Sequence, residues 1–176
     1  MHTINTIPKM SKKTATLITL VAVIFAAIGF RYQEPVNIER VCEDSPPLLI
    51  NNINSCSFVD QTLNFLEAEG YKPVILENSE KNSGLLRKKF SLKIFEVPNY
   101  KIDNNTGPAQ FGFINGRLFA ISYFPKASDT VFERHPASRS ETLTVKHLTN
   151  HQGLKYISWS NNHLETYITW WISRFS

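Results

Sequence analysis

The longest apolar stretch of the chain, residues 14–30, contains no charged side chain and directly follows a segment that carries Lys9, Lys12 and Lys13. Its length is at the lower end of the roughly 17–25 residues that cross a hydrocarbon core about 30 Å thick. A basic flank before an apolar run directs membrane insertion and stays in the cytoplasm. We therefore expect a basic cytoplasmic flank at 1–13, a single transmembrane anchor at 14–30, and an extracytoplasmic remainder.

The same stretch also fits a cleaved signal peptide, because its length does not separate the two cases. Signal cleavage prefers small residues one and three positions before the cut, and the Ala-Ile-Gly sequence of residues 27–29 supplies them. Bulky Phe30 and charged Arg31, directly after that site, favour the uncleaved anchor. The alternative is a secreted or periplasmic protein released by cleavage near Gly29.

The first helix of the exported part is predicted over residues 57–69. Ser57 is in position to cap this helix, and Asp60 stands three residues later as the second member of a capping box. Gly70 follows and can adopt the left-handed conformation that ends helices. The apolar stripe of the predicted helix consists of Phe58, Val59, Leu63 and Leu66, with Phe65 at its margin.

Strand patterns follow this helix. Residues 74–76 form a short apolar run, and apolar and polar side chains alternate over 90–94 until Pro98 ends the pattern. The sharpest local pattern is an Asn-Gly pair at 115–116, between two runs of β-forming residues. Such a pair favours a two-residue hairpin turn, because both turn residues need positive φ. We therefore predict a β-hairpin over 111–124.

A two-residue turn fixes the register of this hairpin, so that Phe113 should oppose Leu118 and Gly112 should oppose Phe119. The missing side chain of Gly112 would leave room for the Phe119 ring. Alternation then makes both faces apolar, which is unusual for an antiparallel pair with one side in water. One face carries Phe111, Phe113, Leu118, Ala120 and Phe124, and the other carries Ile114, Phe119, Ile121 and Tyr123. We interpret the hairpin as central in the sheet and covered on both sides; the alternative is that one face is a binding surface.

The C-terminal third of the chain predicts a short helix, a second hairpin and a final helix. The short helix is expected over 128–135, and the second hairpin joins 143–147 to 154–159. The final amphipathic helix begins after a cap at Asn161 or Asn162. Its apolar stripe consists of Leu164, Tyr167, Ile168, Trp171 and Phe175. Trp170 lies about 120° away from that stripe and is therefore expected at the edge of the core or in solvent.

Together these patterns predict an α+β fold. An antiparallel sheet of about five to six strands is packed by a helix on its N-terminal side and by the C-terminal amphipathic helix. Proline and asparagine residues interrupt any periodicity over 31–56, which we interpret as an extended lead-in. Residues 57–176 then form one extracytoplasmic domain, which is a usual size for a single core.

The two cysteines of the chain, Cys42 and Cys56, both lie in the predicted lead-in. An isolated pair in an oxidising compartment usually forms a disulfide, and we predict that bond here. The alternatives are two unrelated thiols or a metal site, although two cysteines without a nearby histidine do not complete a tetrahedral site.

The net charge of +4 comes mainly from the N-terminal flank. Of the 19 basic residues three precede the apolar run, so that 16 remain after it against 15 acidic residues, a net charge of +1. A nucleic-acid-binding domain is normally far more basic, so we expect no nucleic-acid partner.

The candidate residues for chemistry show no spacing that catalysis or metal binding requires. They are His135, His147, His151 and His163, with Asp129, Glu133 and Glu141 as carboxylates that could orient them. His147 and His151 are four residues apart, but a strand and a turn are predicted around them instead of the helix of a metal motif. The chain also lacks nucleophile-elbow and glycine-rich phosphate-binding motifs. We predict no catalytic residue, no metal and no cofactor.

These observations favour a membrane-anchored, non-enzymatic module that binds another envelope protein through an exposed apolar patch. The candidate surface comprises Trp170 and the hairpin residues Phe119 and Tyr123, since aromatic side chains often anchor interfaces. One alternative is a small-ligand carrier or sensor with an apolar cavity beside Phe119 and Tyr123. A second alternative is a small exported hydrolase that uses the histidines of region 135–151.

Overall fold

The computed structural model describes Val23, Gly29 and residues 33–44, 46–82, 89–126 and 128–175. The chain divides into two units, Met1–Glu34 and Pro35–Ser176, and all helices and strands named below belong to the second. The predicted anchor at 14–30 lies outside the described residues except for Val23 and Gly29. None of the described helices is long and apolar enough to cross a membrane.

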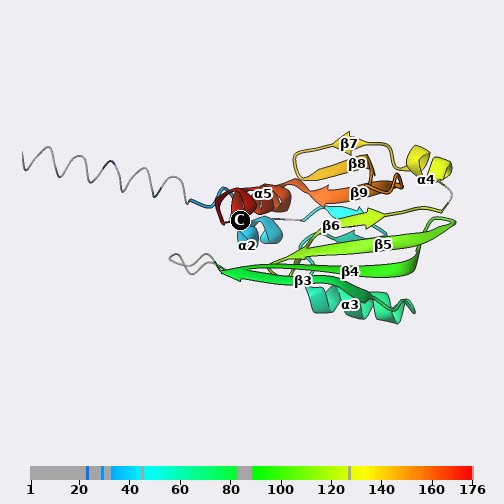
Figure 1. Ribbon diagram of the computed structural model, residues 1–176, viewed down its shortest axis with the longest axis horizontal. Coiled ribbons are helices and arrows are strands. Elements are labelled where there is room, and N and C mark those ends of the chain that lie inside the picture. The colour runs from blue at the N-terminus through cyan, green and yellow to red at the C-terminus, as the bar shows by residue number, and fades with distance from the viewer. Residues whose placement is uncertain are drawn as a thin grey trace, which may run out of the picture. The chain divides into compact units, whose positions relative to one another are not determined.

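The main feature of the second unit is a seven-stranded antiparallel sheet with the strand order β3-β4-β5-β6-β9-β8-β7 (Figure 1). Its strands are β3 (Val74–Asn82), β4 (Lys89–Ile102), β5 (Asn105–Ile114), β6 (Arg117–Tyr123), β7 (Ser138–Arg139), β8 (Leu143–Thr149) and β9 (Lys155–Asn161). A separate antiparallel pair consists of β1 (Leu48–Ile50) and β2 (Ile53–Asn54). The helices are α2 (Ile38–Glu43), α3 (Val59–Ala68), α4 (Ser128–Arg134) and α5 (Asn162–Phe175). The predicted α+β fold is confirmed, but the sheet is larger than expected, because β7 is too short for alternation to reveal it.

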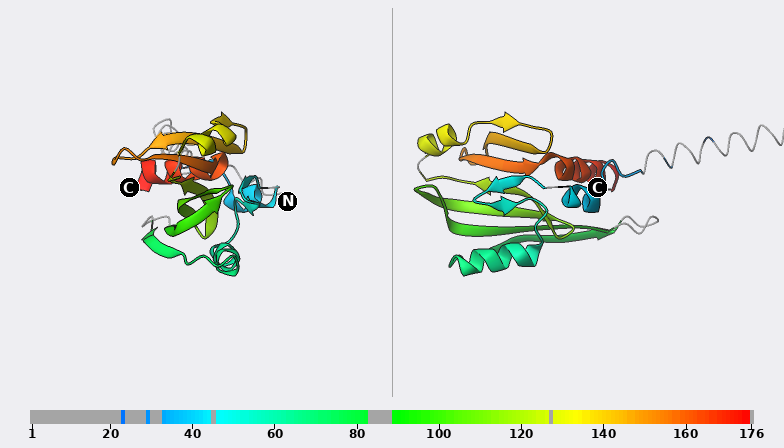
Figure 2. Two further views of the ribbon diagram at one scale, coloured as in Figure 1. Left: turned by 90° about the vertical axis from the view of Figure 1, so that its right-hand side faces the viewer. Right: turned by 180° about the vertical axis from the view of Figure 1, so that it is seen from behind.

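Apolar side chains are buried on both faces of this sheet. One core cluster includes Phe111 and Phe113 and packs against the β1–β2 pair and α3. The other includes Phe90 and Ile114 and packs under α5. Helix α5 lies on the side of the sheet that faces the viewer in Figure 1, and the β1–β2 pair lies in front in the reversed view of Figure 2. The β5–β6 hairpin is therefore central, as its two apolar faces predicted.

The β5–β6 turn has the predicted conformation, with positive φ at Asn115 and Gly116. The register is correct only next to the turn, where Phe113 opposes Leu118. An irregularity at Phe119 then shifts the pairing, so that Gly112 opposes Ala120 instead of Phe119. The shift moves Ile121 and Tyr123 into the same core cluster as Phe111 and Phe113, and leaves Phe119 in the cluster under α5. The predicted division of the hairpin into faces was wrong beyond the bulge, because a bulge inserts one extra residue into one strand.

The start of helix α3 and the effect of Pro98 on strand β4 both differ from the prediction. Helix α3 begins after Phe58, and its first turn is bridged by Gln61, whose side-chain oxygen accepts the Phe58 N–H at 3.2 Å. Ser57 is not the cap, because its hydroxyl donates to the carbonyl of Asn54 at 2.9 Å. Strand β4 does not stop at Pro98: its pairing with β5 shifts there and then continues to Ile102. Proline lacks an N–H donor, and a bulge accommodates that loss within a sheet.

The predicted disulfide is present and joins Cys42 in α2 to Cys56 in the turn that follows β2. The lead-in is not extended throughout, because α2 and the β1–β2 pair lie within it. Leu49 and Ile50 of β1 belong to the main core cluster. The disulfide therefore fixes α2 to a segment that is itself anchored in the core.

Helix α5 begins at the predicted cap. The Asn161 side-chain oxygen accepts the N–H groups of His163 and Leu164 at 3.0 and 3.3 Å, and its Nδ2 donates to Ser55 Oγ at 2.9 Å. Leu164, Tyr167 and Trp171 of the predicted stripe are buried. Trp170 is also buried, with 6% of its surface exposed, because its ring packs against Tyr167 and Phe175.

Candidate functional site

The most exposed apolar group of the described sheet lies on its outer strand β3. Val74, Ile75 and Leu76 are consecutive, and 53%, 60% and 51% of their surfaces are exposed. Strand β3 is at the end of the sheet, and β4 is its only partner among the described strands. We call these three residues and the main chain that carries them the β3 edge.

The β3 edge differs from the rest of its strand in both geometry and charge. The pairing with β4 shifts between Ile75 and Glu77, so that Leu76 forms a bulge. Glu77, Glu80 and Lys81 then follow along the rest of β3. Charged side chains and bulges are devices that prevent edge strands from pairing with other chains. The first three residues of β3 include a bulge but no charge, and so are the part of the strand most open to a partner.

A second candidate feature is a groove of about 420 Å³ beside helix α5. Residues of α5 form one wall, and Arg139 of β7 with Thr144 and Lys146 of β8 forms the other. Pro35 also lines the groove. We call this feature the α5 groove; its lining residues are Pro35, Arg139, Thr144, Lys146, Asn162, Glu165, Thr166, Thr169, Trp170, Ser173 and Arg174.

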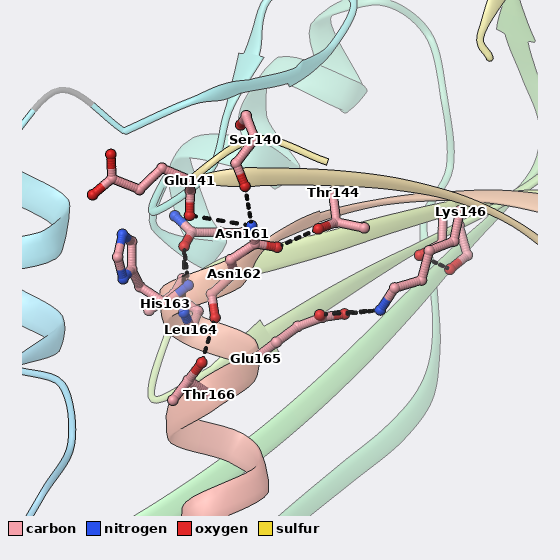
Figure 3. Close-up of polar contacts among 12 residues, drawn as sticks. Ser140, Glu141, Thr144, Lys146, Asn161, Asn162, His163, Leu164, Glu165 and Thr166 are labelled. Carbon is pink, nitrogen blue, oxygen red and sulfur yellow. Dashed lines mark hydrogen bonds and ion pairs between the residues drawn. The ribbon is translucent and has the colours of Figure 1, made fainter. Parts of the chain in front are cut away.

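Polar contacts at the start of α5 hold the two walls of the groove together (Figure 3). The Asn162 amide donates to the carbonyl oxygens of Ser140 and Glu141 at 2.8 and 3.2 Å, and its side-chain oxygen accepts the Thr144 hydroxyl. Lys146 Nζ lies 3.2 Å from Glu165 Oε2 and links β8 to the first turn of α5. These contacts fix the position of β8 relative to α5, and the shape of the groove between them is therefore determined by the fold of the domain.

The α5 groove has a positive balance of charge. Three basic residues, Arg139, Lys146 and Arg174, stand against a single acidic residue, Glu165, which gives a net charge of +2. The Arg174 guanidinium carbon lies 5.7 Å from the centroid of a Trp170 ring and so over the aromatic floor of the groove. Lys146 is already paired with Glu165, so that its charge is engaged within the lining of the groove.

The three residues predicted as a binding surface divide between the two core clusters: Trp170 and Phe119 belong to the cluster under α5, and Tyr123 belongs to the other. Trp170 lines the α5 groove although it is largely buried. Phe119 packs, half-buried, against the core cluster under α5. Tyr123 is fully buried in the other cluster, and its hydroxyl has no hydrogen-bond partner among the described residues. Burial, together with the nearby Asp103 and Tyr71, raises the pKa of Tyr123 to about 12.

Of the four candidate histidines, His135 and His147 are neighbours, and His151 and His163 line separate pockets. His147 lines a pocket of about 460 Å³ together with Glu133, and its Nε2 lies 2.8 Å from the carbonyl oxygen of His135. His151 lines a pocket at the far end of the β8–β9 hairpin, and His163 lines another together with Glu141. The side chain of Asp129 lies outside what the structure describes. In the described part of the chain, no three His, Cys, Asp or Glu residues are arranged to hold a metal ion.

The carboxylate that contacts His135 is one that sequence reasoning missed. His135 Nε2 lies 3.5 Å from Asp103 Oδ2, and Arg134 contacts the same oxygen at 3.5 Å. Asp103 is in the turn between β4 and β5 and is far from both residues in sequence. The basic residues of the α5 groove were missed for the same reason, because they come from separate elements and share no sequence spacing.

A comparison of this chain with known protein families, curated proteins and solved structures finds no match.

Proposed function

We propose that this chain is a membrane-anchored extracytoplasmic module that binds another envelope protein and catalyses no reaction. The observation that carries this proposal is the β3 edge. Three consecutive aliphatic side chains, each more than half exposed, lie on a strand that is at the end of the sheet among the described strands. The proposed binding partner presents an extended apolar segment that adds to β3.

Strand addition suits this surface for two reasons. The main chain of an edge strand provides hydrogen bonds in the register of the sheet, and the alternating side chains select the partner sequence. Fully burying an aliphatic side chain contributes about 1.5–3 kcal/mol relative to leaving it exposed. Because Ile75 already has part of its surface covered, its contribution to binding should be about 1–2 kcal/mol.

Two further features support the proposed location of the domain outside the cytoplasm, next to a membrane anchor. The apolar run at 14–30, with its basic flank, is typical of a segment inserted into a membrane with the following domain outside. The Cys42–Cys56 bond supports an oxidising compartment, where such bonds persist.

The test is affinity capture of the tagged full-length protein from its own cells, followed by titration of the purified partner. Ile75→Lys should weaken the affinity by about 5–30-fold, which corresponds to the 1–2 kcal/mol of lost burial. Leu154→Lys is the matched control, because Leu154 is similarly exposed, at 53%, but lies next to the β8–β9 turn. It should change the affinity less than two-fold. An Ile75→Lys protein that folds normally and binds with unchanged affinity would refute the proposal.

A second candidate function, that of an exported hydrolase, is favoured by the pocket that contains both His147 and Glu133. In this candidate His147 would act as a general base through its remaining nitrogen, because Nε2 already contacts the His135 carbonyl. The purified protein would then hydrolyse members of a p-nitrophenyl ester panel, and His147→Ala would abolish that activity. Unchanged activity in His147→Ala would exclude this pocket as the source.

A further inference from the structure

Helix α5 lies at one end of the sheet face that it covers. Strand β9 runs from the β8–β9 turn to the start of α5, so that the turn and the helix are at opposite ends of this strand. In Figure 1, α5 lies at the left of the sheet, and β9 extends from it to the right. On the part of the face toward the β8–β9 turn, Gln110, Ser122 and Tyr156 are half-buried. This part of the face is therefore within reach of a ligand.

A row of polar side chains crosses the sheet at this place. Residues that are directly opposite each other in an antiparallel pair present their side chains to the same face. The pairings of five neighbouring strands form one line, which consists of Glu96, Gln110, Ser122, Ser158 and Lys146. Gln110 Nε2 donates to Glu96 Oε2 at 3.1 Å, and Ser122 Oγ donates to Ser158 Oγ at 3.3 Å. These bonds position Gln110 and Ser122, and each side chain keeps an oxygen that can accept a further hydrogen bond.

Two aromatic side chains lie next to this polar row, on its side toward the β8–β9 turn. Phe124 comes two residues after Ser122, and Tyr156 comes two residues before Ser158, so both belong to the same face as the row. Main-chain pairing continues to Phe124, whose N–H donates to the carbonyl of Pro108 at 2.9 Å. The two rings are stacked, with centroids 4.7 Å apart and planes 24° from parallel. Hydrogen-bonding groups and flat apolar rings are therefore side by side on one surface.

A pocket of about 290 Å³ lies where the polar row meets the aromatic pair. Its volume is close to the lower limit of the roughly 300–1,000 Å³ that is usual for small-molecule sites, which suits a single ring. The β8–β9 turn forms one side: Asn150 Oδ1 accepts the N–H groups of Gln152 and Leu154 at 3.0 and 2.9 Å, and the Asn150 amide keeps its own donors. The described residues that line the pocket carry no carboxylate, ammonium or guanidinium group; they are Gln110, Ser122, Phe124, Asn150, His151 and Tyr156.

We propose that this pocket binds one neutral pyranose ring of a glycan. A pyranose combines an apolar face of C–H groups with a rim of hydroxyl groups, and the pocket offers aromatic rings to the first and polar side chains to the second. The C–H hydrogens carry a partial positive charge and are attracted to the negative face of an aromatic ring. Each hydroxyl group both donates and accepts, which suits the amides of Gln110 and Asn150 and the hydroxyl of Ser122.

The composition of the pocket disfavours other classes of ligand. A phosphate or carboxylate ligand would meet no ammonium or guanidinium group in the described lining. A purely apolar ligand would bury the amides of Gln110 and Asn150 without replacing their hydrogen bonds to water, which is unfavourable. The pocket lies on β5, β6 and β9, so the inference depends neither on the β3 edge nor on the predicted anchor.

The test is a ligand-observed NMR titration of the full-length protein in micelles of a polyoxyethylene detergent, which contains no sugar. The ligands are chitotriose, cellotriose and maltotriose, which distinguish an N-acetylated, a β-linked and an α-linked glycan. Adenosine and inorganic phosphate represent flat aromatic and anionic ligands. We expect at least one trisaccharide to bind with a Kd of about 1 mM or tighter, the affinity that the atoms of one bound ring can supply. Its binding should be at least about ten-fold tighter than that of adenosine or phosphate.

Variants of the lining then test the assignment of the pocket. Tyr156→Ala removes a stacking surface and Gln110→Ala removes an amide, and each should weaken binding of that trisaccharide by about 2–12-fold. Urea midpoints show whether each variant is folded, and the half-buried Gln110 keeps the test valid if Tyr156→Ala unfolds. Phe65→Ala is the matched control, because Phe65 is an exposed aromatic residue, at 42%, on α3, whose Leu66 belongs to the main core cluster. It should change the affinity by less than about two-fold.

Three results would overturn the inference. The first is no saturable binding of any of the three trisaccharides up to about 20 mM. The second is binding of adenosine or phosphate as tight as that of the best trisaccharide, which would indicate a different class of ligand. The third is an unchanged trisaccharide affinity in folded Tyr156→Ala and Gln110→Ala proteins. Partner capture that depends on Ile75 is measured without sugar, so that the proposed function and this inference can fail separately.

Discussion

Gly112 and Phe119 offer a sharp test of the packing between the central hairpin and α5. A Cβ atom built on Gly112 would lie 2.7 Å from Cε1 and 2.9 Å from Cζ of the Phe119 ring. Carbon atoms in favourable contact are about 3.5–4.0 Å apart, so the ring would have to move by roughly 1 Å. Phe119 is half-buried and packs against the cluster under α5, which limits that movement.

The expected cost of Gly112→Ala follows from two opposing effects. Overpacking a well-packed site costs about 1–3 kcal/mol, whereas replacing a glycine in a strand interior gains about 0.5–1 kcal/mol. We therefore expect the free energy of unfolding to fall by about 0.5–2 kcal/mol. The measurement is equilibrium urea unfolding of the oxidised protein, followed by tryptophan fluorescence.

A double-mutant cycle tests whether the Phe119 ring is the cause of the destabilisation by Gly112→Ala. In a Phe119→Ala background no ring lies over residue 112, so Gly112→Ala should be neutral or stabilise by up to about 1 kcal/mol. The coupling free energy between the two sites should then be at least about 1 kcal/mol. An equal cost of Gly112→Ala in both backgrounds would refute this reasoning and would locate the requirement for glycine in the backbone.

Four further predictions concern stability, each measured as a urea midpoint of the oxidised protein unless stated. Asn161→Ala removes the α5 cap and a buried hydrogen bond and should cost about 2–3 kcal/mol; a loss below about 0.5 kcal/mol would contradict the assigned role. Trp170→Ala should cost about 3 kcal/mol or more because the ring is buried, and an unchanged midpoint would place the ring in solvent. Reduction of Cys42–Cys56, which are separated by 14 residues, should cost about 3 kcal/mol when midpoints with and without dithiothreitol are compared; equal midpoints would contradict it. The raised pKa of Tyr123, about 12, means that the unfolded phenol ionises first, so stability should fall by up to about 2 kcal/mol between pH 10 and 12. Tyr123→Phe should reduce that fall, and an unchanged slope would refute the assignment.

The local elements of this protein were readable from its sequence because short-range physics determines them. Positive φ at a two-residue turn selects Asn-Gly, and the β5–β6 hairpin was predicted at that pair. The Asn161 cap and the Gly70 stop were found in the same way, since each acts within one helical turn. The α+β class followed from the order of these elements.

Predictions from the sequence alone were wrong where the position of a side chain depends on how its spatial neighbours pack. Strict alternation assigned Ile121 and Tyr123 to the wrong face, because the bulge at Phe119 is set by the space above Gly112 and by packing under α5. Trp170 was expected at the edge of the core or in solvent because a single stripe was assumed, but it is buried because α5 is packed by the sheet, by α2 and by its own aromatic neighbours.

Only the tertiary structure shows which residues come together at the β3 edge and at the α5 groove. The apolar run at 74–76 was visible in the sequence, but only the strand order makes it an exposed edge instead of a buried central strand. Arg139, Lys146 and Arg174 belong to three elements, and only sheet pairing and the docking of α5 bring them to one groove. Patterns within a few residues therefore determined the helices α3, α4 and α5 and the turn at Asn115 and Gly116, but not helix α2. The long-range pairing of strands, whose free energy depends on the whole core, decided which side chains meet and which remain exposed.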